Sequence, residues 1–176
     1  MTGANRSPRD FAGYARLEAI NVVFVPGLAL GYGWPRTIAE AVAIGVAIIA
    51  AAGFLVIGTL YWRGLAARLR GDSSTAMTAA LRTADRWERP LVVVTALASI
   101  LLAVGIVTLG WTAAMIASAV LTALAWLEYV NYYHWQLQHF DRMADTRRLL
   151  AGRGLRRSHM ARDLARHRAG RLRGSR

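Results

Sequence analysis

The sequence predicts an all-α fold: a polytopic membrane protein with a bundle of four transmembrane helices and an arginine-rich cytoplasmic tail. Its composition is otherwise contradictory, because 55% of the 176 residues are hydrophobic while the net charge is +12. The two properties separate along the chain, since residues 19–35, 41–62 and 90–127 contain no Asp, Glu, Lys or Arg. These runs lack the strict alternation of β-strands, and only helices and closed barrels satisfy their backbone in lipid. Helical spans are therefore expected.

The lengths of the uncharged runs set the number of spans. A hydrocarbon core about 30 Å thick needs about 20 helical residues, so residues 90–127 should hold two spans with a reversal near Gly110 and Trp111. The expected spans lie near residues 15–34, 38–62, 90–109 and 112–134. A secretory signal peptide is the competing interpretation of the first run, but it requires a small-residue cleavage site, which residues 31–35 match poorly.

The positions of the basic residues predict the orientation. All 22 are arginine, and only Arg36, in the first connection, falls on the opposite face from the other 21. The positive-inside rule places the face with 21 arginines in the cytoplasm. We therefore expect a multi-pass protein of the cell membrane with both termini cytoplasmic. A composition rich in alanine and free of lysine is typical of a GC-rich genome, which favours a bacterial inner membrane.

Two cytoplasmic segments are expected between and after the spans. Residues 72–88 should form a short amphipathic helix on the inner leaflet, since Met77, Leu81 and Ala84 follow helical spacing apart from the arginines. A solvated linker helix is the alternative. Residues 141–176 form a basic tail, partly helical or disordered. Its first part should continue the fourth helix through Leu150, with a further helical stretch around residues 158–167 and a disordered end.

From Arg142 onward, the chain carries 12 arginines against two aspartates, which gives this segment a net charge of +10. Each arginine near a membrane attracts anionic lipid by about 1 kcal/mol. The candidate contacts to lipid headgroups are Arg147, Arg148, Arg156 and Arg157. The alternative is a tail that only enforces topology and solubility. Because aromatic residues are not interleaved with these arginines, specific nucleic-acid binding is not expected.

A short repeat supplies the candidate polar site. Residues 15–21 and 125–131 both read Ala-x-Leu-Glu-x-(Ile/Val)-Asn. In a helix, this spacing puts Glu18 beside Asn21 and Glu128 beside Asn131, one turn apart on one face. Counting back from Trp34 and forward from Trp111 places both glutamates about 24–26 Å from the outer edge, at 1.5 Å per residue.

Two carboxylates at one depth, on the first and fourth spans, are expected to meet near the cytoplasmic leaflet, with His134 continuing down the fourth helix. Arg63 and Arg89 are the candidate charge partners. Ionisable groups at membrane depth usually face the bundle interior and mark functional sites. The alternative is a Glu–Arg–Asn network that only holds the helices together.

Several other chemistries are excluded or disfavoured. Cysteine is absent, which rules out disulfides, Cys-ligated zinc and thiol catalysis. His134 and His139 would lie about 140° apart around a helix and so cannot hold one ion together. Nucleotide loops and serine-hydrolase elbows are missing. Pro26-Gly27 in the first span favours a packing kink over a transport site. Gly27 and Gly31 should form a surface that a neighbouring helix can approach closely. On the second span, Ala43, Ala47 and Ala51 should do the same. No metal and no cofactor are expected.

These observations favour a non-enzymatic accessory or interaction subunit that engages membrane partners or anionic lipid. A membrane-protein partner and a second copy of the chain are both compatible with this interpretation. The alternative is a small intramembrane enzyme or carrier for a lipidic or protonatable molecule, built on Glu18, Asn21, Glu128, Asn131 and His134. The sequence leaves the choice between enzyme and binding protein open.

Overall fold

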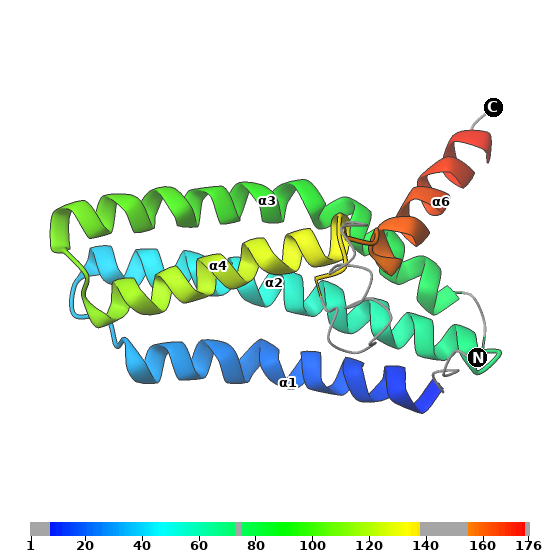
Figure 1. Ribbon diagram of the computed structural model, residues 1–176, viewed down its shortest axis with the longest axis horizontal. Coiled ribbons are helices and arrows are strands. Elements are labelled where there is room, and N and C mark those ends of the chain that lie inside the picture. The colour runs from blue at the N-terminus through cyan, green and yellow to red at the C-terminus, as the bar shows by residue number, and fades with distance from the viewer. Residues whose placement is uncertain (1–7, 73–74, 138–154, 175–176) are drawn as a thin grey trace. The chain divides into compact units, whose positions relative to one another are not determined.

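The computed structural model describes residues 8–72, 75–137 and 155–174. Figure 1 shows their helices: α1 (Pro8–Tyr32), α2 (Ile38–Leu69), α3 (Thr75–Leu109), α4 (Ala113–Tyr133) and α6 (His159–Gly174). The predicted all-helical class is confirmed. The chain divides into two compact units, a first unit of Met1–Ala125 and a second unit of Trp126–Arg176, each considered by itself below.

Within the described residues, three helices are long and apolar enough to cross a membrane, namely α2, α3 and α4. They indicate a membrane-embedded, multi-pass protein. The first predicted span corresponds to α1, which is not among the three. Its apolar stretch is interrupted by Arg16, Glu18 and Asn21, whose polar side chains lower the mean hydropathy of the helix.

Helix α2 is the centre of the first unit, because it packs against both α1 and α3 (Figure 1). Its buried face is made largely of small side chains, and Ala47, Ala50 and Ala51 are fully buried. The predicted packing role of Ala43, Ala47 and Ala51 is therefore confirmed. Small residues let helices approach closely, which matters in lipid because no hydrophobic driving force brings apolar helices together there.

Glycines mark the closest approaches between helices. A Cβ added at Gly64 of α2 would lie 3.0 Å from the Cα of Met77 in α3. Gly53 similarly faces the Leu91 side chain. The expectation that Gly27 and Gly31 form such a surface is wrong within this chain, because a Cβ at either position would have nothing within 4 Å. On α1 the inward face is the one that carries Pro26, and Gly27 lies about 100° around the helix from it.

The segment predicted to be a separate interfacial helix is part of α3, which runs from Thr75 to Leu109 with Pro90 inside it. Proline at this position removes one backbone hydrogen bond. The helix nevertheless continues, because one buried face connects Leu81 and Ala84 before the proline with Leu91 and Thr95 after it. Contact of the first half of α3 with a lipid leaflet stays a prediction.

The predicted reversal near Gly110 is confirmed. Helix α3 ends at Leu109 and α4 begins at Ala113. Gly110 has a φ of +75°, a left-handed conformation that glycine adopts at little cost and that commonly ends helices. Its N–H donates to the carbonyl of Ile106 at 2.9 Å. This tight turn lets two spans follow each other without a charged connection.

We predict that Gly33→Ala lowers the unfolding temperature in detergent. The added Cβ would lie 2.6 Å from the Ala113 carbonyl oxygen and 2.9 Å from the Ala114 Cα, and backbone atoms cannot move aside cheaply. Overpacking typically costs about 1–3 kcal/mol. Gly31→Ala is the matched control, because it has open space and removes a helical glycine. It should leave the unfolding temperature unchanged or raise it. Equal shifts for the two substitutions would contradict the close approach of Gly33, in the connection after α1, to the start of α4.

Candidate functional site: a basic cleft in the first unit

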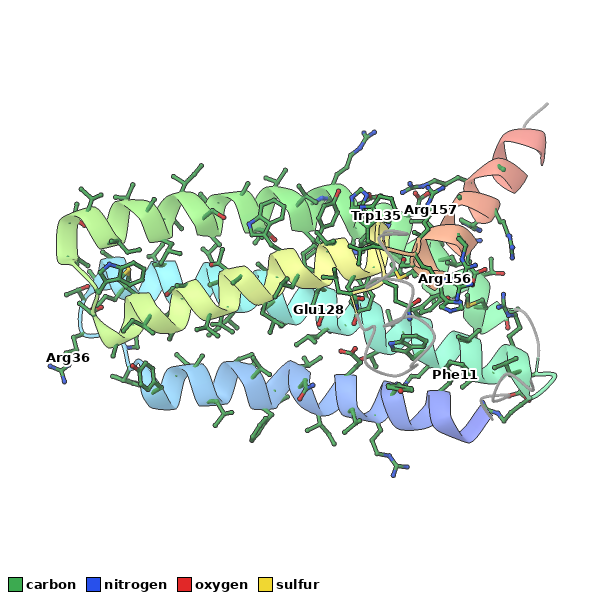
Figure 2. All side chains as sticks on the ribbon, in the orientation of Figure 1. Phe11, Arg36, Glu128, Trp135, Arg156 and Arg157 are labelled. Carbon is green, nitrogen blue, oxygen red and sulfur yellow. The ribbon has the colours of Figure 1, made fainter. Side chains whose placement is uncertain are left out.

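Charge is distributed unequally between the two ends of the first unit. The connections 33–37 and 110–112 lie at one end, where Arg36 points outward, while Phe11 lies towards the other end (Figure 2). The half of the unit that contains Phe11 is called the basic end here. Its arginines with described side chains are Arg16, Arg63, Arg68, Arg70, Arg82, Arg86 and Arg89.

Glu40 organises the end opposite the basic end. Its Oε2 accepts hydrogen bonds from the backbone N–H of Arg36 at 2.8 Å and of Thr37 at 3.1 Å. The Thr37 hydroxyl in turn accepts from the Glu40 N–H at 3.2 Å, which completes a capping box at the start of α2. The Thr112 side chain also hydrogen-bonds this carboxylate. Sequence analysis missed this role, although the Thr-x-x-Glu pattern before an apolar run signals it.

An aromatic cluster joins α1 to α2 at the basic end. The ring of Trp62 stacks on Phe11 with centroids 5.8 Å apart and lies 5.7 Å from the ring of Tyr14. Tyr61 approaches Trp62 edge-on at 5.3 Å. Aromatic pairs of this kind stabilise by about 0.5–1.5 kcal/mol beyond the area that they bury. The cluster fixes the register of α1 against α2 beside the arginines that follow.

A cleft opens among α1, α2 and α3 at the basic end. Its volume is about 800 Å³. The cleft exists because the three helices face one another with small side chains, which leave space between the backbones. Its apolar lining consists mainly of alanine: Ala12, Ala15, Ala19, Ala66, Ala67, Ala76, Ala79 and Ala80. Three arginines, Arg16, Arg63 and Arg70, complete it together with Ile20, Leu60, Gly64 and Thr83.

The arginines of this basic cleft differ in their partners. The Arg70 Nε donates to Asp72 Oδ2 at 3.0 Å, in an exposed ion pair. For Arg16 and Arg63, no ion pair is found among the described residues. The sequence did not predict this cleft. Of its arginines, only Arg63 was named as a candidate residue, and then as a charge partner for the glutamates. The recurrence of alanine at positions 12, 15 and 19 is the signal that points to the cleft, because this spacing keeps one face of α1 small.

The predicted polar site divides between the two units. Glu18 and Asn21 lie one turn apart on α1, half-buried, in the first unit. Arg63 and Arg89 are exposed, and neither makes an ion pair within the described part of the chain. Neither arginine therefore neutralises Glu18 in the first unit. Glu128 and Asn131 belong to the second unit, so the expected meeting of the two glutamates stays a prediction.

Within the described part of the second unit, Glu128 is one of two residues with a buried side-chain atom that lacks a hydrogen-bond partner, the other being His167. The Glu128 carboxylate is hydrogen-bonded by the side chains of Asn131 and Tyr132. Its Oε2, however, is buried and has no partner among the described residues. Asn131 has a second role, since its Oδ1 accepts the Leu137 N–H at 3.0 Å beyond the end of α4. The Glu-Asn pairing predicted for this helix is thus present.

The fourth helix was expected to continue to Leu150. This expectation is wrong for residues 134–137, because α4 ends at Tyr133. The N–H groups of His134 and Trp135 both donate to the Val130 carbonyl, at 3.0 and 2.8 Å, which closes the last turn. His134 is exposed and follows the helix rather than continuing it, with its ring edge-on to Tyr129 at 4.9 Å. His134 is therefore placed beside Tyr129, and its part in the site of Glu128 and Asn131 stays a prediction.

A short antiparallel pairing replaces the helix. Trp135 pairs with Arg157, and the Gln136 N–H donates to the Arg156 carbonyl at 2.8 Å. Trp135, Arg156 and Arg157 are labelled in Figure 2. Backbone groups here find partners across the pairing instead of within a helix, which satisfies them equally well. The contacts of Arg156 and Arg157 with lipid remain a prediction. Arg147 and Arg148 lie outside the described residues.

Ser158 connects this pairing to α6. Its hydroxyl donates to the Tyr132 carbonyl at 2.6 Å and accepts from the Ala161 N–H at 2.9 Å, so it also acts as the N-cap of α6. The predicted helical stretch around residues 158–167 is confirmed, and α6 extends further, to Gly174. The end of the chain expected to be disordered is therefore helical up to that residue. Met160, Ala161 and Leu164 form the buried side of α6.

These features define a membrane-embedded, multi-pass helical protein with an alanine-lined basic cleft. Comparisons with protein-family profiles, with curated proteins and with solved structures find no match. Among the described residues, no group of three or more His, Asp or Glu side chains is placed to hold a metal ion. The chemistry that the cleft offers is binding, since guanidinium groups pair with phosphate and carboxylate in bidentate fashion.

Proposed function

We propose that the protein is a four-span bundle of the bacterial inner membrane that acts as a non-enzymatic interaction subunit and engages anionic lipid through its cytoplasmic face. The observation that carries this proposal is the apolar character of the exposed helix faces. Between Val93 and Val107 of α3, the exposed residues follow helical spacing and are all aliphatic: Val93, Leu97, Ile100, Ala103, Val104 and Val107. The buried face of the same stretch holds Thr95, Ala98 and Gly105. This arrangement inverts that of a water-soluble helix and fits lipid as the solvent.

The same pattern supports α1 as the fourth span. Between Leu17 and Leu28, its exposed large residues are all apolar and lie on adjoining helical positions: Leu17, Ile20, Val23, Phe24 and Leu28. In water, such a stripe would be an unusually large exposed apolar patch. In a membrane, it would face lipid, with the charged first turns of α1 at the basic end. Four spans place the two ends of the first unit on opposite sides of the membrane.

The unequal arginine distribution supports the orientation. Arg36 lies at one end, and the other seven arginines whose side chains are described in the first unit occupy the basic end. The positive-inside rule assigns the basic end to the cytoplasm. There it faces a leaflet rich in anionic lipid, which attracts each nearby arginine by about 1 kcal/mol. A membrane-protein partner or a second copy of the chain would meet the apolar stripes within the membrane.

The orientation is testable by cysteine labelling, because the natural chain contains no cysteine. We predict that a membrane-impermeant maleimide labels Ala39→Cys in intact bacterial cells. Gly13→Cys, Thr78→Cys and Ala169→Cys should react only after permeabilisation. All four positions are exposed, so a difference reports the side of the membrane rather than burial. Labelling of Gly13→Cys and Ala39→Cys from the same side would contradict α1 as a span.

The lipid preference is testable by native mass spectrometry of the full chain released from nanodiscs. We predict that phosphatidylglycerol remains bound in preference to phosphatidylcholine, because arginines attract anionic headgroups. Raising the salt concentration should weaken the preference, as screening reduces interactions between exposed charges. Equal retention of the two lipids at low salt would contradict the proposed engagement of anionic lipid.

A second function is favoured by one observation, the buried Oε2 of Glu128, which has no partner among the described residues. A carboxylate near lipid that is only partly hydrogen-bonded can take up a proton or a cation. In this proposal the protein is a carrier or intramembrane enzyme for a lipidic or protonatable molecule, and Glu128 is the proton-accepting group. Asn131 and Tyr132 would orient its carboxylate.

Substitution of the glutamates separates the two functions. If Glu128 carries protons, Glu128→Gln should abolish proton uptake into proteoliposomes while leaving the unfolding temperature unchanged, because the amide keeps the shape of the side chain. Glu18→Gln and the double variant test whether the two residues act together. Glu88→Gln in α3 is a control that removes one carboxylate elsewhere. If Glu128→Gln fails to fold, so that the loss of proton uptake follows from unfolding alone, Glu128 has a structural role.

A further inference from the structure

We infer that the basic cleft binds one phospholipid with an anionic headgroup, which sits on Arg16 and Arg63 while its acyl chains follow α1. This inference rests on the proposed function and gives it a site. It concerns the first unit only, because every residue that lines the cleft belongs to Met1–Ala125. The headgroup contacts expected from the sequence for the arginine-rich tail stay a separate prediction.

The charge of the cleft selects an anion. Three arginines line it and no acidic residue does. Arg16 and Arg63 come from different helices and have no ion-pair partner among the described residues, so their guanidinium groups are available to a ligand. Arg70 is shared with Asp72 through an exposed ion pair and contributes less. Two guanidinium groups from different helices that line one cleft suit a phosphate, which each of them can bind in bidentate fashion.

The shape of the cleft selects a bulky ligand rather than a bare ion. A volume of about 800 Å³ is in the range of sites for small molecules, roughly 300–1,000 Å³, and far exceeds that of one phosphate. The alanine walls are apolar but offer no large side chains to fill the space. Ala15, Ala66 and Ala80 are buried at its base, which gives a ligand a smooth apolar floor. A glycerol backbone with the first carbons of its acyl chains fits this lining.

The cleft is continuous with a surface that suits acyl chains. Ile20 lines the cleft and is 53% exposed, and one turn further along α1 Val23 and Phe24 are exposed as well. A ligand with its headgroup at Arg16 can therefore lay its chains along these residues towards the middle of the membrane. A free phosphate or a soluble headgroup would leave this stripe unused. The combination of paired arginines and an adjoining apolar stripe points to an intact phospholipid.

The test is the dissociation constant of the first phosphatidylglycerol bound to the full chain, measured by titration and native mass spectrometry. Arg16→Gln combined with Arg63→Gln should raise this dissociation constant roughly 10- to 30-fold, since each arginine near a membrane surface contributes about a factor of five to the affinity. Arg82→Gln combined with Arg86→Gln is the matched control. It removes the same charge from exposed positions on α3 that do not line the cleft, and it should change the constant by less than about threefold.

A second pair of variants tests the cleft without changing charge. Ala12→Leu combined with Ala79→Leu places larger side chains at two exposed positions of the lining, where the fold can accommodate them. Binding should weaken to a similar extent, with the helical circular dichroism and the unfolding temperature retained. Unchanged binding in these variants and in the double arginine variant would overturn the cleft as the site.

Competition identifies the source of the phosphate. Inorganic phosphate and glycerol 3-phosphate, at millimolar concentration, should not displace the bound phosphatidylglycerol, because neither occupies the apolar stripe. Displacement by either would overturn the assignment to an intact lipid. If the two arginine pairs weaken binding equally while the natural chain still prefers phosphatidylglycerol, the cleft fails but the proposed function stands. If the natural chain shows no preference, the proposed function itself fails.

Discussion

The close approach of α1 and α3 to the small-residue face of α2 is the interaction on which the rest of the structure depends. In lipid, an apolar side chain gains no hydrophobic free energy when it exchanges contact with lipid tails for contact with another helix. Helices therefore associate through tight van der Waals packing. Ala47, Ala50 and Ala51 allow this on α2, and Gly64 brings the backbone of α3 close. With the small residues turned inward, the large aliphatic residues are left on the outside, where a membrane would contact them.

The same small residues explain why a cleft exists at the basic end. Where alanines face alanines across three helices without a large side chain to fill the space, a gap of about 800 Å³ remains. The aromatic cluster of Phe11, Tyr14 and Trp62 holds α1 to α2 beside this gap instead of inside it. Seven arginines with described side chains lie at this end, which is the end predicted to face the cytoplasm. Packing and topology together thus produce a basic, alanine-lined cleft without any catalytic motif.

Sequence reasoning located the elements well and the contacts poorly. The apolar stretches of α2, α3 and α4 and the turn at Gly110 follow from uncharged runs of defined length and from a glycine that permits a positive φ. The Glu128–Asn131 pairing was predictable because both residues lie on one helix. By contrast, the role expected for Gly27 and Gly31 was wrong, since helical spacing shows that two residues share a face but not which face turns inward.

The sequence by itself determined that the chain is helical, where α3 turns into α4, and that its arginines lie outside three long uncharged runs. These properties depend on neighbours along the chain: apolar runs, glycine and proline, and arginine counts. Only the tertiary structure decided that Arg16 and Arg63 share one alanine-lined cleft, and that α4 ends at Tyr133 where Trp135 pairs with Arg157. Both outcomes depend on residues far apart in the sequence, whose meeting is set by packing in space.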